Sequence, residues 1–264
     1  MLPHLSLSPA VSRRPARGGA LALFLQREGR FVLFAIAALV AAITPANYSR
    51  TVRQATAQAI CFSTWQALPG YALLSVLAGG VLTHVVAVSA ASYGLSHLAL
   101  EAVVRVYVIE LLPLAAALFV ALRSGLDAAG QLARERARGA DFATPTLFRN
   151  QVVPSVAANL LAVLVLSLSS GLLVLAVAYL VVYGVTPWGL ADYTRLVGQV
   201  FDPVTAPAVL LKTVLFGVAV ACAPVAAALD APRRAASGSE MRVMARLLLF
   251  LVAIEGAVLV LLHF

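Results

Sequence analysis

Basic residues gather in three blocks along the chain, and this charge pattern constrains the fold more than any other feature. Sixteen of the nineteen lysines and arginines lie at positions 13–53, 123–149 and 233–246, and the stretches between these blocks are almost wholly apolar. Loops rich in lysine and arginine stay in the cytoplasm because positive charge resists translocation. Each block therefore marks the cytoplasmic side, and each apolar gap must cross the membrane an even number of times.

The composition also indicates a membrane protein. The chain is 62% hydrophobic and 11% charged, whereas soluble domains are usually about 45–50% apolar and about 25% charged. The net charge of +8 does not indicate nucleic acid binding, because the basic residues flank apolar runs and carry little aromatic interleaving. Anionic lipid headgroups or an acidic partner fit this charge better. Cys61 and Cys222 match no metal-ligand spacing, so no metal site is expected.

Long apolar runs predict an all-α integral membrane protein with five spanning helices. A helix needs about 20 residues to cross the hydrocarbon layer of a bilayer. The chain offers such runs at about 71–91, 98–122, 152–182, 204–229 and 243–264. Because the basic blocks stay in the cytoplasm, the N-terminus is expected there and the C-terminus on the opposite side.

Shorter segments complete this predicted topology. The apolar run 31–43 has too few residues to cross the bilayer and carries arginines on both sides, so it predicts an interfacial or re-entrant elbow helix. Residues 1–20 are expected to be a disordered cytoplasmic lead. The stretch 44–66 is polar and compatible with a helix, and Trp65 near its end suits a membrane interface. The basic segment 123–151 is predicted to be a cytoplasmic loop.

Polar and ionisable residues inside the predicted spans are candidate functional residues, because a charge in the hydrocarbon layer is costly. Glu101 and Arg105 lie four residues apart in the second predicted span, a spacing that suits an ion pair. Two interpretations stay open: the pair neutralises itself inside the bundle, or it serves a substrate cavity or a subunit seam. Asn159 adds a polar side chain to the third predicted span.

Three further ionisable residues fall within predicted spans. Lys212 lies about two turns into the fourth, where it either extends its ammonium group outward to the interface or takes part in function. Glu255 has no partner nearby in the sequence, so it is expected to face protein or a wet cavity rather than lipid. For Glu110 and Glu255, function or subunit contact is the favoured interpretation.

Enzymatic chemistry finds little support in the sequence. The four histidines, at positions 4, 84, 97 and 263, are scattered, and no carboxylate cluster shows metal-ligand spacing. The chain also lacks a glycine-rich phosphate loop of the Walker type, so it is expected to bind no cofactor and to hydrolyse no ATP itself. A membrane enzyme that acts on lipid through His97 or Glu101 remains as an alternative.

Several motifs keep a recognisable order and spacing. The chain reads IELLP at 109–113, then nine residues, then RSG at 123–125, and it reads LLKTVLFG at 210–217. Arg242 and Arg246 form an R-x-x-x-R pair, and the acidic Glu255 follows. In this order the motifs resemble the MlaE family of ABC transporter permeases, which serve MCE-type lipid transport systems. The resemblance covers about residues 20–264.

Some positions depart from the family pattern. Ile109 and Leu112 replace an arginine and a glycine of the family's RELGP motif, and the family's E-Q-[IL]-[DS]-A-L coupling sequence is absent from the basic loop. That loop is either an ordinary positive-inside loop or a divergent helix that docks on an ATPase. The residues that would carry the second role are Arg123, Gln131, Arg134, Glu135, Arg136, Arg138, Asp141, Phe142, Phe148 and Arg149.

The resemblance implies a multi-pass permease domain over residues 21–264 in a bacterial inner membrane, with a periplasmic C-terminus. It further implies two permease copies, a cytoplasmic ABC ATPase that carries ATP and Mg²⁺, a periplasmic MCE-domain protein and a membrane lipid as substrate. In this picture Glu110, Lys212 and Glu255 provide polar positions in the cavity or at the dimer seam. The missing coupling sequence leaves one alternative, a degenerate non-transporting scaffold that pairs with a standard permease.

Overall fold

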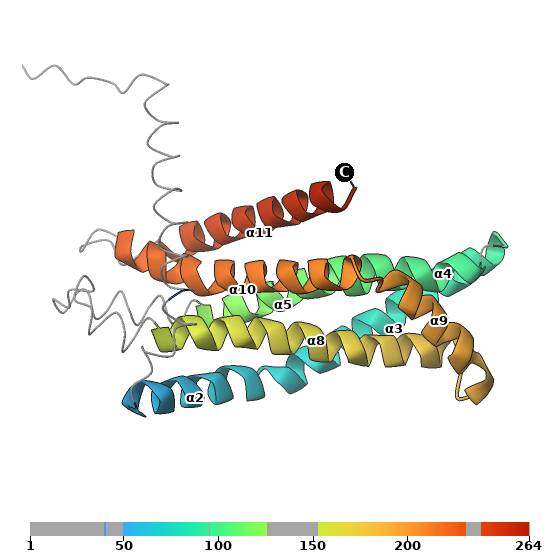
Figure 1. Cartoon of the computed structure of the whole chain (residues 1–264), viewed down its shortest axis with the longest axis horizontal. Coiled ribbons are helices and arrows are strands. Elements are labelled where there is room, and N and C mark those ends of the chain that lie inside the picture. Colours follow the sequence, from blue (N-terminus) through green and yellow to red (C-terminus); the bar gives the residue numbers. More distant parts are fainter. Residues whose placement is uncertain (1–39, 41–49, 95, 126–152, 231–238, 264) are drawn as a thin grey trace, which may run out of the picture.

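The computed structural model describes residues 40, 50–94, 96–125, 153–230 and 239–263. All regular structure in these ranges is helical, and the long helices lie lengthwise in one bundle (Figure 1). The lead 1–20, the elbow 31–43 except residue 40, and most of the basic loop 123–151 were predicted for residues outside the described ranges, so those predictions stay open.

Four helical segments of the described chain are long and apolar enough to cross a membrane, and they coincide with the first four predicted spans. They are Leu68–Ser92, which is helix α3, Leu98–Arg123, Val153–Tyr183, which is α8, and Thr205–Ala223, which lies in α10 (Thr205–Asp230). Helix α11 (Ser239–His263) occupies the place of the fifth predicted span. That α11 crosses the membrane, and the orientation of the termini, remain predictions.

The second span is not one regular helix. It begins as α4 (Ser96–Ala102), widens into the π-helical segment η2 (Val103–Leu111), continues as α5 (Leu112–Val120) and ends in η3 (Ala121–Gly125). Pro113 stands at the start of α5. A proline lacks the backbone N–H and its ring clashes with the carbonyl group four residues back, so the wide turn just before it relieves that clash.

Glycines end two of the long helices. Gly94, two residues after the end of α3, adopts a φ angle of +71°, and Gly184, directly after α8, adopts a φ angle of +68°. This left-handed conformation is easily reached by glycine, and it stops a helix and reverses the chain. The first and second spans are therefore joined by a short connection between Ser92 and Ser96.

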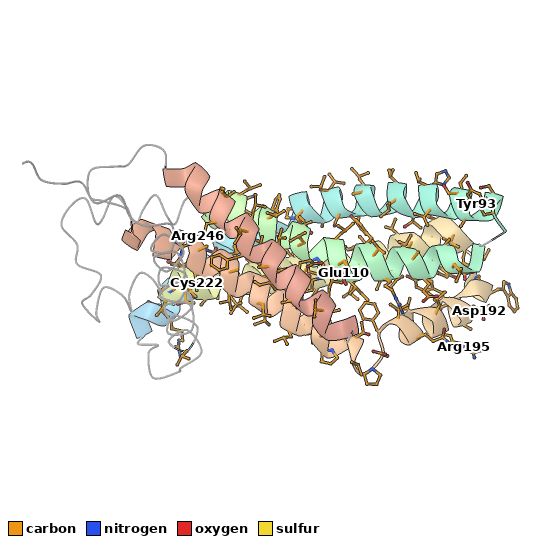
Figure 2. The ribbon with its side chains drawn as sticks, turned by 90° about the horizontal axis from the view of Figure 1, so that it is seen from above. Tyr93, Glu110, Asp192, Arg195, Cys222 and Arg246 are labelled. Carbon is orange, nitrogen blue, oxygen red and sulfur yellow. The ribbon has the colours of Figure 1, made fainter. Side chains whose placement is uncertain are left out.

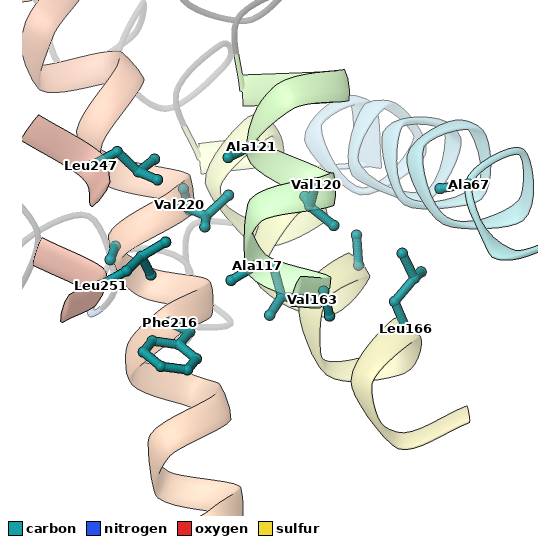
Figure 3. Close-up of a cluster of buried hydrophobic side chains, with 14 of the residues drawn as sticks. Ala67, Ala117, Val120, Ala121, Val163, Leu166, Phe216, Val220, Leu247 and Leu251 are labelled. Atoms are coloured by element: carbon teal, nitrogen blue, oxygen red, sulfur yellow. The ribbon is translucent and has the colours of Figure 1, made fainter. Parts of the chain in front are cut away.

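Helix α8 packs against α2 (Arg50–Trp65), α3, α5 and α10 and so forms the centre of the bundle. A core of buried alanine, valine, leucine and phenylalanine joins α5, α8, α10 and α11 (Figure 3). Small residues allow close approach of the helices. A β-carbon on Gly217 of α10 would lie 2.6 Å from Leu160 Cδ1 and 3.3 Å from the Leu160 carbonyl oxygen of α8.

The outer face of α3 carries apolar side chains that have little cover in the isolated chain. Leu73, Leu77, Val81 and Val85 are each more than half exposed. A soluble monomer does not leave such a long apolar row in water, whereas lipid tails cover it without cost. Trp65, at the end of α2, is 77% exposed, which suits the interface position that the sequence predicted.

We expect the substitution Gly217→Val to separate α8 from α10, because the valine side chain would occupy space now filled by Leu160 and its backbone. Overpacking of this kind destabilises a folded protein by about 1–3 kcal/mol. Thermal unfolding of the purified protein in detergent should show a lower midpoint. Gly70→Val is the matched control, since no described atom outside the local helix backbone and the neighbouring residues lies within 4 Å of a β-carbon at Gly70. Equal midpoints for the two variants would contradict the close packing.

Candidate functional site

Three charged side chains from three different helical segments meet inside the bundle. The Lys212 ammonium group of α10 donates hydrogen bonds to Glu110 Oε2 of η2 and, at 2.8 Å, to Glu255 Oε1 of α11. Glu110 lies 102 residues and Glu255 lies 43 residues from Lys212 in the chain. We call this cluster of Lys212, Glu110 and Glu255 the ion triad.

Lys212 is among the most buried side chains of the molecule, with 1% of its surface exposed. The interpretation in which its ammonium group extends outward to the interface is therefore wrong. An ammonium group in an apolar interior is stable only when it is paired and hydrogen-bonded, and here two carboxylates provide both. The physical reason for the inward direction is thus the presence of Glu110 and Glu255 on neighbouring elements.

Apolar packing excludes solvent from the lysine but less completely from its partners. Phe216, one turn further along α10, is fully buried, and its ring centroid lies 5.8 Å from Lys212 Nζ. The side chains of Glu110 and Glu255 are 23% and 19% exposed. Within the described residues, Glu255 Oε2 is buried and makes no hydrogen bond. The triad is therefore a largely dehydrated site with one ammonium group and two carboxyl groups.

The triad lies well inside the helices that carry it. Figure 2 shows Glu110 away from both ends of the bundle, between Tyr93 and Asp192 at one end and Arg246 and Cys222 at the other. Lys212 is about 10 Å along α10 from Thr205, at 1.5 Å per residue of α-helix, and Glu110 lies twelve residues into the candidate span that begins at Leu98. Both residues therefore lie in the interior of candidate membrane spans and not at their ends.

The geometry of the second span places Glu110 toward Lys212. Glu110 is the penultimate residue of the π-helical segment, and the N–H of Leu112 bonds to the carbonyl of Tyr107, five residues back. Each residue of a π-helix turns the chain less than in an α-helix, so the widened turn changes the direction of the side chains it carries. Segments of this kind are frequent at functional sites.

The predicted pair of Glu101 and Arg105 forms, but not inside the bundle. Arg105 Nη2 lies 3.6 Å from Glu101 Oε1, and the side chains are 66% and 42% exposed. The ion pair is therefore confirmed, and the interpretation in which it neutralises itself inside the bundle is wrong, because both side chains are exposed. A role of the pair in a substrate cavity or at a subunit seam stays a prediction. Asn159, in contrast, is 3% exposed on α8, directly before the Leu160 that contacts Gly217.

An aspartate caps the helix that carries Lys212. Asp202 Oδ1 accepts hydrogen bonds from the backbone N–H groups of Thr205 at 2.6 Å and Val204 at 3.1 Å. The Thr205 bond, above all, holds the pKa of this carboxyl below its ordinary value, and the Arg105 charge adds to the effect. Asp202 thereby satisfies donors that the first turn of α10 would otherwise leave free.

Of the residues predicted to contact an ATPase, Arg123 has a described side chain. It is exposed at the end of the second span, and its guanidinium group donates to Gln66 Oε1 at 3.2 Å, next to the junction of α2 and α3. The other predicted coupling residues, Gln131 to Arg149, lie outside the described ranges. Their role stays a prediction.

Sequence reasoning singled out all three members of the triad but did not predict that they touch. It also missed two tyrosines that join the first span to the second. Tyr71 donates to the Leu112 carbonyl at 2.9 Å, and Tyr107 donates to the Ser75 carbonyl at 3.2 Å. No periodicity could have revealed these bonds, because the residues lie 41 and 32 positions apart in the chain.

A helical bundle with several candidate membrane spans and a buried ion cluster defines a polytopic membrane protein, and the charge inside its apolar layer is typical of transport proteins. The sequence model of the family described as "Permease MlaE" matches residues 56–255, and the chain belongs to this family. The match includes the whole ion triad. Among curated proteins, none matches the sequence of this chain.

Family membership decides between two of the interpretations made from the sequence. Members of the MlaE family are membrane permeases of ABC-type lipid transporters and not enzymes. The chain is therefore a multi-pass transport subunit, and the alternative of a lipid-modifying enzyme does not hold.

Within the described residues, no three histidine, cysteine, aspartate or glutamate side chains lie close enough together to hold a metal ion.

We expect Lys212→Met to destabilise the protein by about 3 kcal/mol, because two partly buried carboxyl groups would lose their cation. The triple variant Glu110→Gln/Lys212→Met/Glu255→Gln, which has no charge at the site, should recover most of this loss. Unfolding in detergent measures both. Arg105→Met is the control, since an exposed pair contributes less than about 1 kcal/mol. A triple variant as unstable as Lys212→Met alone would show that unpaired charge is not the cause of the lost stability.

Proposed function

We propose that this chain is the permease subunit of an ATP-driven MCE-type lipid transporter in the bacterial inner membrane. It moves phospholipid or another hydrophobic lipid between that membrane and a periplasmic MCE protein. One observation supports the proposal beyond family membership: the ion triad joins α11 to the second and fourth candidate spans in the interior of the bundle.

In the proposed topology α11 is the fifth span and the C-terminus is periplasmic. Its 25 residues extend over about 37 Å, which exceeds the hydrocarbon layer of about 30 Å. The three basic blocks then share the cytoplasmic side, in agreement with the rule that positive loops stay inside. Glu255, in the interior of this helix, faces Lys212 and not the lipid.

The proposed partners follow from this topology and from the family. A second permease completes the membrane part, and a cytoplasmic ABC ATPase supplies ATP, Mg²⁺ and the energy of hydrolysis. The ATPase contacts the basic loop between the second and third spans, and the MCE-domain protein receives or delivers lipid on the periplasmic side. This chain itself holds no cofactor in the proposed mechanism.

In this mechanism the second span transmits the movement of the ATPase to the interior of the permease. Closure of the ATPase pushes the loop that follows Arg123, and the second span transmits the push to Glu110. The triad links Glu110 to Lys212 and Glu255, so α10 and α11 respond together. The π-helical turns before Pro113 provide an irregular segment at which the span can change its winding. Transport requires two such arrangements with different affinities for the lipid.

Lipid transfer tests the role of the triad. We expect Glu255→Gln to reduce ATP-driven lipid transfer at least tenfold in proteoliposomes that contain the permease, the ATPase and the MCE protein, because α11 loses its ionic link to α10. A tenfold change corresponds to about 1.4 kcal/mol. Arg105→Gln removes an exposed charge of the second span and serves as the control. Unchanged transfer by Glu255→Gln, with Arg105→Gln also unchanged, would remove the triad from the mechanism.

The basic loop can be tested separately, and this test distinguishes a working permease from a scaffold. Alanine at Phe142, Phe148 and Arg149 together should abolish co-purification of the ATPase and lipid transfer, because the loop would lose its apolar and charged contacts. If both persist, the loop does not couple the subunits. If the unaltered chain transfers lipid only when a second, motif-complete permease is present, it is the degenerate scaffold.

A further inference from the structure

The end of α8 is built as a rigid turn and not as a loose loop. Gly184 ends α8, the short helix η5 (Pro187–Gly189) follows, and α9 (Leu190–Val200) folds back toward the start of α10 (Figure 1). A β-carbon on Gly189 would lie 2.5 Å from the Tyr183 ring. The backbone of the turn is thus packed directly on an aromatic ring, where a larger residue could not fit.

Three tyrosines fix this turn to α8. The rings of Tyr179, Tyr183 and Tyr193 lie 5.2–6.3 Å apart, a spacing that suits stacked and edge-to-face contacts. The Tyr193 hydroxyl donates to the Leu175 carbonyl at 2.6 Å, and the Tyr179 hydroxyl donates to the Thr186 carbonyl. Burial raises the pKa of Tyr193 to about 12. Tyr193 thereby joins α9 to α8.

The rigid turn presents two large apolar side chains outward. Val185 is 92% exposed and Trp188 is 90% exposed, the highest fractions among the large hydrophobic residues that the structure describes. Burial of such a side chain is worth about 1.5–3 kcal/mol relative to exposure in water. A rigid support that holds both side chains away from the protein indicates that something outside the chain covers them.

Continuity with the apolar face of α8 identifies the cover as lipid. The chain carries no charged residue between Arg149 and Asp192. Exposed leucines and valines continue along α8 to the turn, among them Leu172, Leu180 and Val181. Along the chain, the apolar face of α8 is followed by Trp188 and then by the charged Asp192. Membrane proteins show the same order from the hydrocarbon layer, through the interface where tryptophan is enriched, to the headgroups.

Two further features agree with a lipid surface at this end. Tyr93, at the turn after α3, is 80% exposed, and Figure 2 shows it at the same end of the molecule as Asp192 and Arg195. Helix α8 has 31 residues and is about 46 Å long. A tilt of about 30° would bring its vertical extent to about 40 Å, close to that of a bilayer with its headgroups.

We propose that the turn from Val185 to Leu190 inserts the Val185 and Trp188 side chains into the boundary between headgroups and acyl chains of a phospholipid bilayer. Helix α9 lies along that surface, with Asp192 and Arg195 among the headgroups. The turn anchors the end of α8 in a tilted position. Because α9 leads through Asp202 into α10, the anchor also sets the depth of Lys212. This proposal rests on the membrane location of the chain and not on its transport activity.

The two tryptophans of the chain allow a direct test. Trp65→Phe leaves Trp188 as the only tryptophan, and Trp65 is exposed, so this change does not disturb the core. The full chain is reconstituted into phosphatidylcholine vesicles that carry a nitroxide either near the glycerol or at the methyl end of the acyl chain. We expect strong quenching of Trp188 fluorescence by the shallow nitroxide, weaker quenching by the deep one, and little quenching by aqueous iodide.

The other outcomes overturn the proposal and show what replaces it. Dominant quenching by iodide would place Trp188 in water, where it could bind a protein partner. Dominant quenching by the deep nitroxide would place the turn in the hydrocarbon interior. Quenching by none of the three would show that another protein surface covers it. Val185→Asp provides a second readout: it should lower the shallow quenching of Trp188, whereas Thr194→Asp on the already polar α9 should not.

Discussion

The paired burial of Lys212 is the interaction on which the rest of the structure depends. One ammonium group in the apolar layer must have its partners at fixed positions, and these come from η2 and α11. The requirement therefore sets the relative rotation of three helical segments, which apolar side chains alone would leave poorly defined, because lipid covers an apolar face as well as protein does. Such a cluster gives specificity to the packing more than it gives stability.

Close helix packing and irregular winding complement this constraint. Gly217 brings α10 against α8, and the π-helical turns before Pro113 place Glu110 beside Lys212. The same turns interrupt the regular hydrogen bonds of the second span, which leads from the exposed Arg123 to the triad. The movement proposed for this subunit needs a fixed contact and a segment that can change its winding. The contact of Gly217 with α8 provides the first, and the π-helical segment η2 provides the second.

The turn between α8 and α9 is a second place where close contacts fix the backbone. The tyrosine contacts around Gly189 hold α9 against α8, and Asp202 then caps α10, so the position of the turn and that of Lys212 are connected through short, well-bonded segments. The membrane depth that we propose for the turn is therefore connected to the charge pairing in the interior by the chain between α8 and α10.

Sequence alone determined the composition of the layers: apolar length fixed the first four spans, and charge in apolar runs identified Lys212, Glu110 and Glu255. It left open the directions in which side chains point, since it allowed Lys212 to extend outward and allowed the Glu101–Arg105 pair to lie inside the bundle, and both of these interpretations are wrong. Only the tertiary structure decided these directions, together with the tyrosine bonds that join the first span to the second. The reason is physical: hydropathy and periodicity act along one helix, whereas a hydrogen bond between residues a hundred positions apart exists only after the helices have packed.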